Sequence, residues 1–321
     1  MSWQPADNAR ADEEQTMRVL VVGASGAIGT RLIPQLTERG HEVTGTCHSP
    51  GNTVRLRELG AEPVVLDALD ADAVRDAVAA ARPDAIIYQA TALANAKFSL
   101  SLDRTFAPTN RLRTEGTDAL LAAAREEGVR RFVAQSFAPF RYDRRGGPVK
   151  TEDDPLDPAV PKRGRQTFAA MSHLDEAVTG AGGIALRYGG FYGEPDSMTK
   201  AVRRRQYPMI GDGRGIMPFI HLHDAASAAA LAVEHDGPAI YNITDDEPAP
   251  ASEWMPVLAR ALGAKPPRRI PAWIARLIMG DGLPMMTESR GASNEKAKKE
   301  LGWALRYPTW REGFPAAFAT R

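Results

Sequence analysis

Apolar runs alternate with helical patterns from residue 17 to residue 136, and this alternation constrains the fold more than any other feature of the sequence. The first run, MRVLVVG at residues 17–23, is apolar almost throughout, as is typical of a strand buried on both faces. HEVTGTC, AEPVVLD, DAIIYQAT and VRRFVAQS follow, each separated from the next by a segment with helical periodicity. This order predicts an α/β fold of the Rossmann type, a doubly wound parallel sheet with a smaller C-terminal substrate lobe.

The remainder of the chain suggests how the domains are divided. Residues 1–16 are polar, lack the apolar core of a signal peptide, and are predicted to form a flexible tail. We assign residues 17–189 and 219–244 to the dinucleotide-binding domain, and residues 190–218 and 245–321 to the substrate-binding lobe. Residues 139–165 are rich in Pro, Gly and charge, which predicts a surface loop, and a helix is expected over 166–180.

Composition argues against several classes of protein. Lys plus Arg and Asp plus Glu both number 40, so no overall charge favours a nucleic-acid partner. No apolar run approaches the ~20 residues of a membrane span, so no membrane association is expected. The single cysteine, Cys47, excludes an internal disulfide, which favours a cytoplasmic protein. We expect a small-molecule substrate, and either a monomer or a homodimer.

The first predicted turn between strand and helix reads VVGASGAIG. Small residues there allow a pyrophosphate to approach the backbone, and the start of the helix offers it free N–H groups and a partial positive charge. A glycine triplet alone is weak evidence for a dinucleotide site. This triplet lies at the first strand-to-helix turn of a repeated strand–helix pattern, which is where the dinucleotide-binding motif occurs. The predicted cofactor contacts in the turn are Gly23, Ser25, Gly26, Ala27 and Ile28.

The second predicted strand favours NADP (NADPH) over NAD. NAD enzymes place an acidic residue at its end to hold the ribose hydroxyls, but here the chain reads VTGTCHSPGN. His48 and Ser49 could donate to a 2′-phosphate at this position. Asp67 and Ala68, after the third strand, would lie beside the adenine, although Asp67 could instead cap the next helix. Further contacts are predicted at the ends of later strands: Gln89, Ala90, Thr91, Gln135, Tyr188 and Phe191.

These motifs together resemble the extended short-chain dehydrogenase/reductase family, the group that includes NAD-dependent epimerases and dehydratases. The resemblance covers nearly the whole chain from Met17. It rests on GASGAIG, the segment 109–133, LRYGGFYG at 186–193, FIHLHDAA at 219–226 and NEKAKKELGW at 294–303. It implies a Rossmann fold, a bound nicotinamide cofactor and a substrate cleft between two lobes.

The chain departs from this family at the catalytic residues. The family carries a Ser after the fifth strand and a Tyr-x-x-x-Lys pair on the next helix. Ser136 matches the first position, but no Tyr or Lys occurs in residues 163–178. If Glu176 is the acid that follows the family's lysine by four positions, Ser172 replaces the lysine and Phe168 the tyrosine. Ser136 is therefore the one predicted catalytic residue, orienting the substrate's carbonyl oxygen.

Reduction of a ketone without the Tyr–Lys pair needs another proton source: water, Tyr142, Tyr192 or the substrate itself. A phenol or enol beside the ketone would let the substrate stabilise its own alkoxide. We therefore expect an NADPH-dependent ketoreductase acting on a bulky, aromatic, polyketide-type ketone. In kind it is similar to ketoreductases of polycyclic aromatic antibiotic biosynthesis, of the simocyclinone type. The predicted substrate contacts, each of which could instead be an ordinary core residue, are Phe98, Phe137, Tyr142, Phe168, Tyr192 and Met217.

Two other functions remain open at this point. One is an NAD-dependent enzyme of the epimerase/dehydratase type acting on a nucleotide sugar, which the missing Tyr and Lys count against. The other is a non-catalytic redox sensor that binds NADP, which the retained Ser136 and the apolar loop ends count against. No metal site is expected, because His221, His223 and Asp224 lie together without a distant third ligand.

Overall fold

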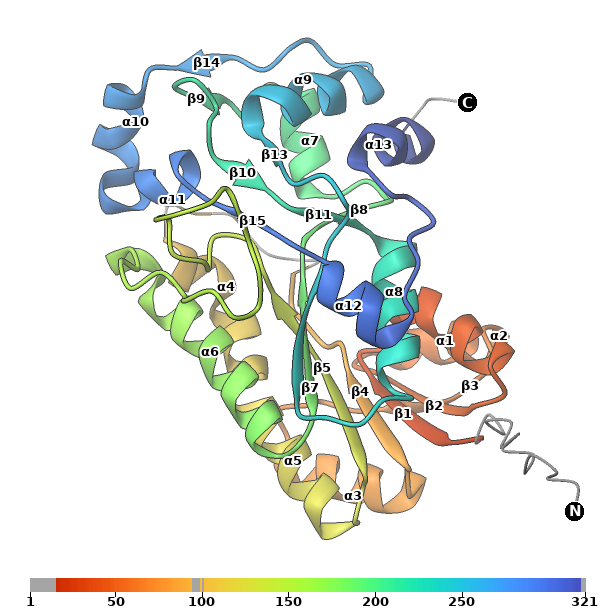
Figure 1. Cartoon of the computed structure of the whole chain (residues 1–321). Helices are drawn as coiled ribbons and strands as arrows, with labels where there is room; N and C mark the ends of the chain where they lie inside the picture. Colours follow the sequence, from red (N-terminus) through yellow and green to blue (C-terminus); the bar gives the residue numbers. More distant parts are fainter. Residues whose placement is uncertain (1–15, 94–98, 100, 319–321) are drawn as a thin grey trace, which may run out of the picture.

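A computed structural model of the chain describes residues 16–93, 99 and 101–318. Nearly all of the predicted tail, and the predicted substrate contact Phe98, lie outside the described residues. Seven parallel strands form the central sheet in the order β12-β7-β5-β4-β1-β2-β3 (Figure 1). They are β1 (Arg18–Val22), β2 (Glu42–Cys47), β3 (Ala61–Val65), β4 (Ala85–Tyr88), β5 (Arg131–Phe137), β7 (Ile184–Tyr188) and β12 (Ala239–Ile243). The predicted doubly wound sheet is confirmed, and the strand order reverses between β1 and β4.

Helices cover both faces of the sheet (Figure 1). One face carries α3 (Ala71–Ala81), α5 (Thr117–Glu126) and α6 (Arg165–Gly180), and the other carries α1 (Gly29–Glu38) and α8 (Leu222–Ala232). Each face has its own apolar core, since strand side chains point alternately to the two sides. The central strands are therefore buried on both faces, which explains their unbroken apolar runs.

The helical segment before β5 starts earlier than residue 109, where the sequence indicates its start, and it is not α-helical throughout. It begins as α4 (Leu102–Arg111) and passes through a π-helical segment at Leu112–Gly116 before it continues as α5. The Tyr88 hydroxyl donates to the Leu112 carbonyl at 2.8 Å, and a Cβ on Gly116 would lie 2.5 Å from the same hydroxyl. The phenol at the end of β4 thus occupies the space beside this turn and satisfies its carbonyl. Segments of this kind are frequent at functional sites.

A second lobe follows β7. Its elements are β8 (Gly190–Tyr192), α7 (Ser197–Arg203), β9 (Met209–Ile210), β10 (Ile216–Met217), β11 (Phe219–His221), β13 (Ala249–Pro250), α9 (Ala251–Ala261), β14 (Arg269–Ile270), α10 (Ala272–Met279), α11 (Leu283–Thr287), β15 (Gly291–Ala292), α12 (Glu295–Leu301) and α13 (Trp310–Phe318). Phe219, Trp254 and Phe314 form its aromatic core. The division into two domains stays a prediction, and α12 departs from it because Ala297 and Leu301 pack into the core beneath the sheet.

The prediction that residues 139–165 form a surface loop is wrong for its first part. Arg141, Tyr142 and Asp143 are 2%, 3% and 5% exposed. Tyr142 forms an isolated antiparallel bridge with Leu156, and β6 (Val149–Lys150) pairs with β15. Arg141 pairs with the buried Asp175, and Asp143 pairs with the exposed side chain of Arg145. The composition of the segment reveals neither contact.

Candidate active site

The glycine turn between β1 and α1 can accommodate only small residues. Gly23 has φ +90°, and a Cβ there would lie 2.6 Å from the Ala90 backbone nitrogen. Its own N–H donates to Thr46 Oγ1 at 3.2 Å, which fixes the turn to the end of β2. Gly26 and Ala27 are exposed. Among the described residues, no hydrogen bond engages the backbone N–H groups of Ser25, Ala27 or Ile28. The turn therefore fits a pyrophosphate at the start of a helix.

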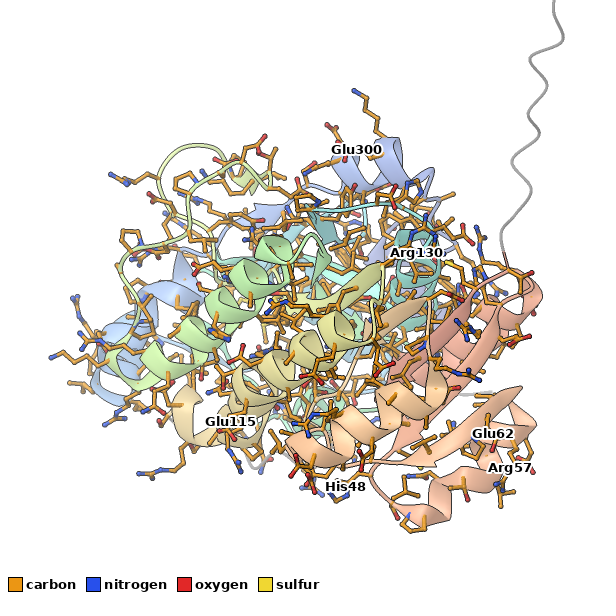
Figure 2. All side chains as sticks on the ribbon, turned by 90° about the horizontal axis from the view of Figure 1, so that it is seen from below. His48, Arg57, Glu62, Glu115, Arg130 and Glu300 are labelled. Carbon is orange, nitrogen blue, oxygen red and sulfur yellow. The ribbon has the colours of Figure 1, made fainter. Side chains whose placement is uncertain are left out.

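The ends of β2 and β3 carry a histidine and an acid side by side. His48 Nε2 lies 4.0 Å from Asp67 Oδ2, and the two side chains are 84% and 52% exposed. Figure 2 shows His48 at the edge of the molecule. Ser49 is also exposed, whereas Ala68 is buried. Asp67 Oδ1 accepts from the Leu69 backbone N–H at 3.0 Å. The alternative reading of Asp67 as a helix cap is wrong, because Asp70 caps α3 by accepting from Ala73 N–H.

Predicted cofactor contacts from β4 and β7 meet at the carboxyl edge of the sheet. The Gln89 amide donates to the Tyr188 hydroxyl at 3.2 Å, and the Tyr188 ring lies 5.4 Å from that of Phe191. Gln89 Oε1 is buried without a partner among the described residues, so it can accept from a bound group. Burial raises the pKa of Tyr188, which keeps its phenol protonated. Ala90 packs on Gly23, and the half-buried Thr91 and Gln135 complete the predicted set.

A guanidinium lies against Ser136 and against Ser172, the residue that the sequence aligns with the family's lysine. After β5 the chain turns at Phe140, which has φ +66°, and Arg141 points back toward Ser136. Arg141 Nη1 donates to Ser136 Oγ at 3.3 Å and to Asp175 Oδ2 at 2.7 Å, while Nη2 donates to Ser172 Oγ at 3.1 Å. Ser136 is 1% exposed. The hydroxyl of Ser136 accepts from a cation here, and its own proton is donated to no described residue.

Asp175 joins Arg141 to a second buried arginine. Its Oδ2 also accepts from Arg187 Nε at 2.8 Å, and Arg187 Nη1 donates to the Tyr142 hydroxyl at 3.1 Å. Tyr142 in turn donates to Asn242 Oδ1 at 2.6 Å, and burial raises the pKa of its phenol. The structure therefore places Tyr142, a predicted substrate contact and possible proton source, inside a hydrogen-bond network behind the site.

Helix α6 carries two adjacent acids, Asp175 and Glu176, and either could be the one that follows the family's lysine by four positions. Asp175 is 3% exposed and paired, whereas Glu176 is exposed. If the buried acid is the one that follows the lysine by four positions, the lysine and tyrosine positions fall on Met171 and Thr167. Neither residue can act as the missing pair, so the departure from the family holds in both registers.

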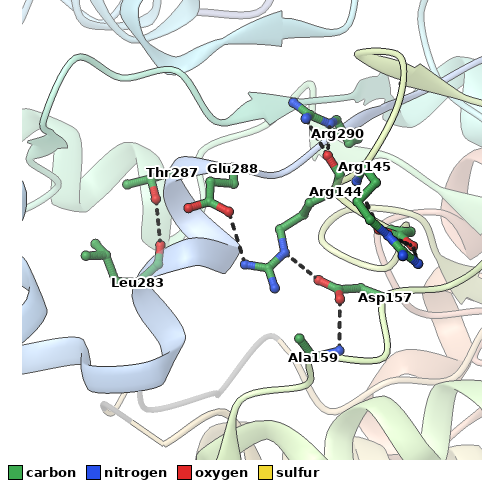
Figure 3. Close-up of polar contacts among 9 residues, drawn as sticks. Arg144, Arg145, Asp157, Ala159, Leu283, Thr287, Glu288 and Arg290 are labelled. Carbon is green, nitrogen blue, oxygen red and sulfur yellow. Dashed lines mark hydrogen bonds and ion pairs between the residues drawn. The ribbon is translucent and has the colours of Figure 1, made fainter.

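A cavity of about 270 Å³ opens beside Arg141 and Ser172, between α6 and the loop that precedes it. Its other lining residues are Leu156, Asp157, Val160, Arg165, Phe168 and Ala169. The loop wall is tied to the second lobe through Arg144, as Figure 3 shows. Arg144 Nε lies 2.7 Å from Asp157 and Nη1 lies 3.4 Å from Glu288, while Arg290 donates to the Arg144 carbonyl. Of the predicted substrate contacts, Phe168 thus faces a cavity.

The other predicted substrate contacts are dispersed. Tyr192 is 2% exposed in the aromatic core of the second lobe, where its ring lies 5.1 Å from that of Phe314. Burial raises the pKa of its phenol. Phe137 and Met217 are half-buried. The ring neighbours of Tyr192 are Phe219, His221 and Phe314, and its role as a substrate contact stays a prediction.

Sequence reasoning missed the buried charged residues near Ser136, which include Arg113, Arg141, Asp175 and Arg187. One signal was present. Arg187 interrupts the apolar strand IALRY, and a charge in such a strand requires a buried partner. Arg141 carried no comparable signal, because it stands in a segment rich in Arg, Asp, Pro and Gly.

A model of the NAD dependent epimerase/dehydratase family matches residues 19–244. The chain belongs to this family. It is 41% identical over 307 residues to a 3-diazoavenalumate denitrifying reductase of a Streptomyces species, covering 92% of this chain and 99% of the relative. It is 25% identical over 332 residues to a 4-hydroxy-2-methyl-3-oxo-4-farnesyl-3,4-dihydroquinoline-1-oxide ketoreductase of Stigmatella aurantiaca, covering 94% and 95%. The protein is therefore an NAD(P)-dependent oxidoreductase.

A solved structure of similar fold is UDP-glucose 4-epimerase of Thermotoga maritima, determined with UDP-glucose. The TM-score is 0.72 at 21% identity, and the match covers 94% of this chain and 97% of the epimerase. Similar structures hold NAD in some cases and NADPH in others, so the family leaves the choice between them open. Within the described residues, no helix is long and apolar enough to cross a membrane.

Proposed function

We propose that the protein is an NADPH-dependent reductase that replaces a diazo group on an aromatic ring with hydrogen. The observation that carries this proposal is the Arg141 guanidinium beside Ser136, in a helix and loop that offer no Tyr–Lys pair. Although burial lowers the pKa of Arg141, an arginine keeps its proton near neutral pH. These residues can therefore hold a negative oxygen but cannot supply the proton that the family's tyrosine supplies.

The proton balance distinguishes two kinds of hydride acceptor. The nicotinamide cofactor supplies a hydride when it is bound. In an arenediazonium ion, hydride replaces N₂ as the C–N bond breaks and the C–H bond forms, and no proton is consumed. A ketone needs a proton as well as a hydride, which the family obtains from its tyrosine. A site that binds oxyanions without a proton donor therefore suits the diazo acceptor, and the name of the Streptomyces relative supports the same class.

The second candidate is the predicted ketoreductase acting on a bulky, aromatic, polyketide-type ketone. Ser136 Oγ accepts from Arg141, so its hydroxyl can donate to a carbonyl oxygen while the nearby cation favours the alkoxide. The proton would come from water or from a phenol of the substrate. The Stigmatella relative, a ketoreductase, supports this candidate. An epimerase on a nucleotide sugar is disfavoured because it needs a base to remove a hydroxyl proton.

The choice of NADPH rests on the ends of β2 and β3. His48 and Ser49 are exposed there and can donate to a 2′-phosphate, whereas Asp67 stands close to His48 and would repel that phosphate. We propose that the two donors outweigh the single acid. The residues that would hold the rest of the cofactor are the turn from Gly23 to Ile28 and the Gln89–Tyr188 pair.

The test follows deuterium from 4-deuterated NADPH into product. A hydroxyarenediazonium salt and an ortho-hydroxyaryl ketone are incubated separately with the protein, and a Gly23→Ala variant corrects for direct reaction with the cofactor. We expect deuterium on the ring carbon and release of N₂ from the first compound. Label only on the carbinol carbon of the second would favour the ketoreductase. If neither product carried deuterium, the non-catalytic NADP-binding sensor would be the remaining candidate function.

A further inference from the structure

Arg113 is a buried guanidinium for which no residue described by the structure provides a hydrogen bond or an ion pair. It lies in the π-helical segment Leu112–Gly116 and is 8% exposed. The Tyr88 hydroxyl holds the adjacent Leu112 carbonyl, which anchors this segment to the carboxyl end of β4. Ligands of doubly wound sheets bind at this edge.

The charges around Arg113 are unbalanced. Burial lowers the pKa of Arg113 to about 10, and the positive charge of Arg141 contributes in the same direction, while Asp175 opposes it. Asp175 is already shared by Arg141 and Arg187. Burial raises the pKa of Glu152, and its carboxylate accepts from the Asn242 backbone N–H. Arg113 thus remains charged at neutral pH without a carboxylate of its own.

An unpaired buried charge is costly unless a ligand compensates for it. The donors of Arg141 are directed to Ser136, Ser172 and Asp175, and those of Arg187 to Asp175 and Tyr142. Of these three arginines, Arg113 is the one with no donor engaged by a described residue, so its whole guanidinium is free for an incoming group. A guanidinium presents a planar fork of N–H groups that matches a carboxylate or another oxyanion.

We propose that Arg113, with the charge of Arg141 behind it, binds an oxyanion of the substrate, so the substrates are acidic aromatic compounds that carry a carboxylate or a phenolate. The inference rests on the proposed function for the substrate's location at the carboxyl edge of the sheet. It adds a recognition residue that neither the family resemblance nor the names of the relatives indicate. The same positive charge would disfavour cationic acceptors that lack an acidic group.

The first experiment measures binding without turnover, in the presence of NADP⁺. Calorimetry compares 4-hydroxybenzoate with its methyl ester, and absorbance follows the ionisation of 4-nitrophenol with and without protein. We expect the acid to bind at least about tenfold more tightly than the ester, or the ionisation midpoint of 4-nitrophenol to move to lower pH. The first result identifies a carboxylate as the ligand group and the second identifies a phenolate.

Arg113→Met should abolish these effects and leave NADP⁺ affinity unchanged, whereas Arg113→Lys should retain part of them. Arg125→Met is the matched control, because it removes an exposed positive charge from α5, which continues the same helix. Three results would overturn the proposal. The acid and the ester could bind equally with no shift in the ionisation midpoint of 4-nitrophenol, no probe could bind at all, or Arg113→Met could bind the probes as tightly as the unchanged protein. Loss of NADP⁺ binding in Arg113→Met would assign Arg113 to the cofactor and overturn it as well.

A second measurement covers the case in which the variants fold poorly. Because the unpaired charge destabilises the ligand-free protein, Arg113→Met should raise its melting temperature by a few degrees. A melting temperature lowered by both Met and Lys would show that Arg113 has a structural role, against the proposal. None of these tests requires a reaction, so failure of the diazo assay and failure of the oxyanion site are distinguishable.

Discussion

The glycine turn after β1 and the arginine cluster after β5 solve the problem of holding a charged group in opposite ways. The turn uses backbone N–H groups, and its sequence is restricted because Gly23 and Gly29 have no room for a side chain. The cluster uses side chains from a loop, a helix and a strand: Arg141, Asp175 and Arg187. A site made of backbone can be recognised from glycine spacing, whereas a site made of side chains depends on tertiary contacts.

The glycine turn is a feature that this chain shares with its family, whereas the arginine cluster is a feature in which the chain departs from it. The turn keeps the geometry that any dinucleotide requires. At the second site, a cation from the loop after β5 contacts Ser136 and Ser172, and residues 163–178 contain no tyrosine and no lysine. The comparison predicts that changes in the turn act on cofactor binding, and that changes in the cluster act on stability and on the acceptor.

Asp175→Asn should have the largest effect on stability. The variant would leave Arg141 and Arg187 without their shared carboxylate, and breaking a buried pair costs roughly 3–5 kcal/mol. Urea denaturation monitored by circular dichroism would measure the loss. Glu176→Gln is the control, since it removes an exposed carboxylate from the next position of α6 and should change stability by less than about 0.5 kcal/mol. Equal effects of the two variants would mean that the cluster is not held by its charges.

Gly23→Ala should act on the other region and abolish cofactor binding. An L-residue at φ +90° is strained by roughly 1–2 kcal/mol, and the new Cβ would lie 2.6 Å from the Ala90 nitrogen. We expect NADPH affinity to fall by about a hundredfold or more, which is roughly 3 kcal/mol. Calorimetric titration with NADPH checks the loss. Gly128→Ala provides a control for the cost of a positive φ, because it has φ +66° but open space around it. Equal NADPH affinity in both variants would contradict the role given to the turn.

Ser136→Ala should separate the two acceptors. A ketone would lose a hydrogen bond to its developing alkoxide, and turnover should fall by roughly ten- to a thousandfold. A diazo acceptor develops no alkoxide at the reacting carbon, so its turnover should change by less than about threefold. Steady-state kinetics with both compounds measures the contrast, and an unchanged NADPH dissociation constant shows that the cofactor site is intact. A large loss with both acceptors would place Ser136 in a step common to them.

Sequence alone predicted the doubly wound parallel sheet, the position of the glycine turn after its first strand, and the absence of the Tyr–Lys pair. It could do so because continuous apolar runs and glycine spacing are local properties. Arg141 could not be predicted, because its burial depends on a backbone reversal at Phe140 and on Asp175 from another element. The segment around it has the composition of an exposed loop, and composition does not show which arginine turns inward.

The burial of two predicted aromatic contacts was not foreseen, for a related reason. Tyr142 and Tyr192 stand near predicted loop ends, which made both reasonable substrate contacts. In the structure, Tyr142 bridges Arg187 and Asn242, and Tyr192 packs against Phe314 of α13, an element more than a hundred residues away in the chain. A long-range partner of this kind leaves no trace in the local sequence.

His48 and Asp67 should show the smallest effects, in opposite directions. Both side chains are exposed, and exposed charges contribute only about 0.2–1 kcal/mol. His48→Ala should weaken NADPH binding by roughly two- to fivefold relative to NADH, while Asp67→Ala should strengthen it by a similar factor because the 2′-phosphate loses a repelling neighbour. Paired titrations with the two cofactors measure the ratio, and added salt should reduce both changes through screening. If either variant changed NADPH and NADH binding equally, the ends of β2 and β3 would not select the cofactor, and the recognisable part of the nucleotide site would be limited to the glycine turn.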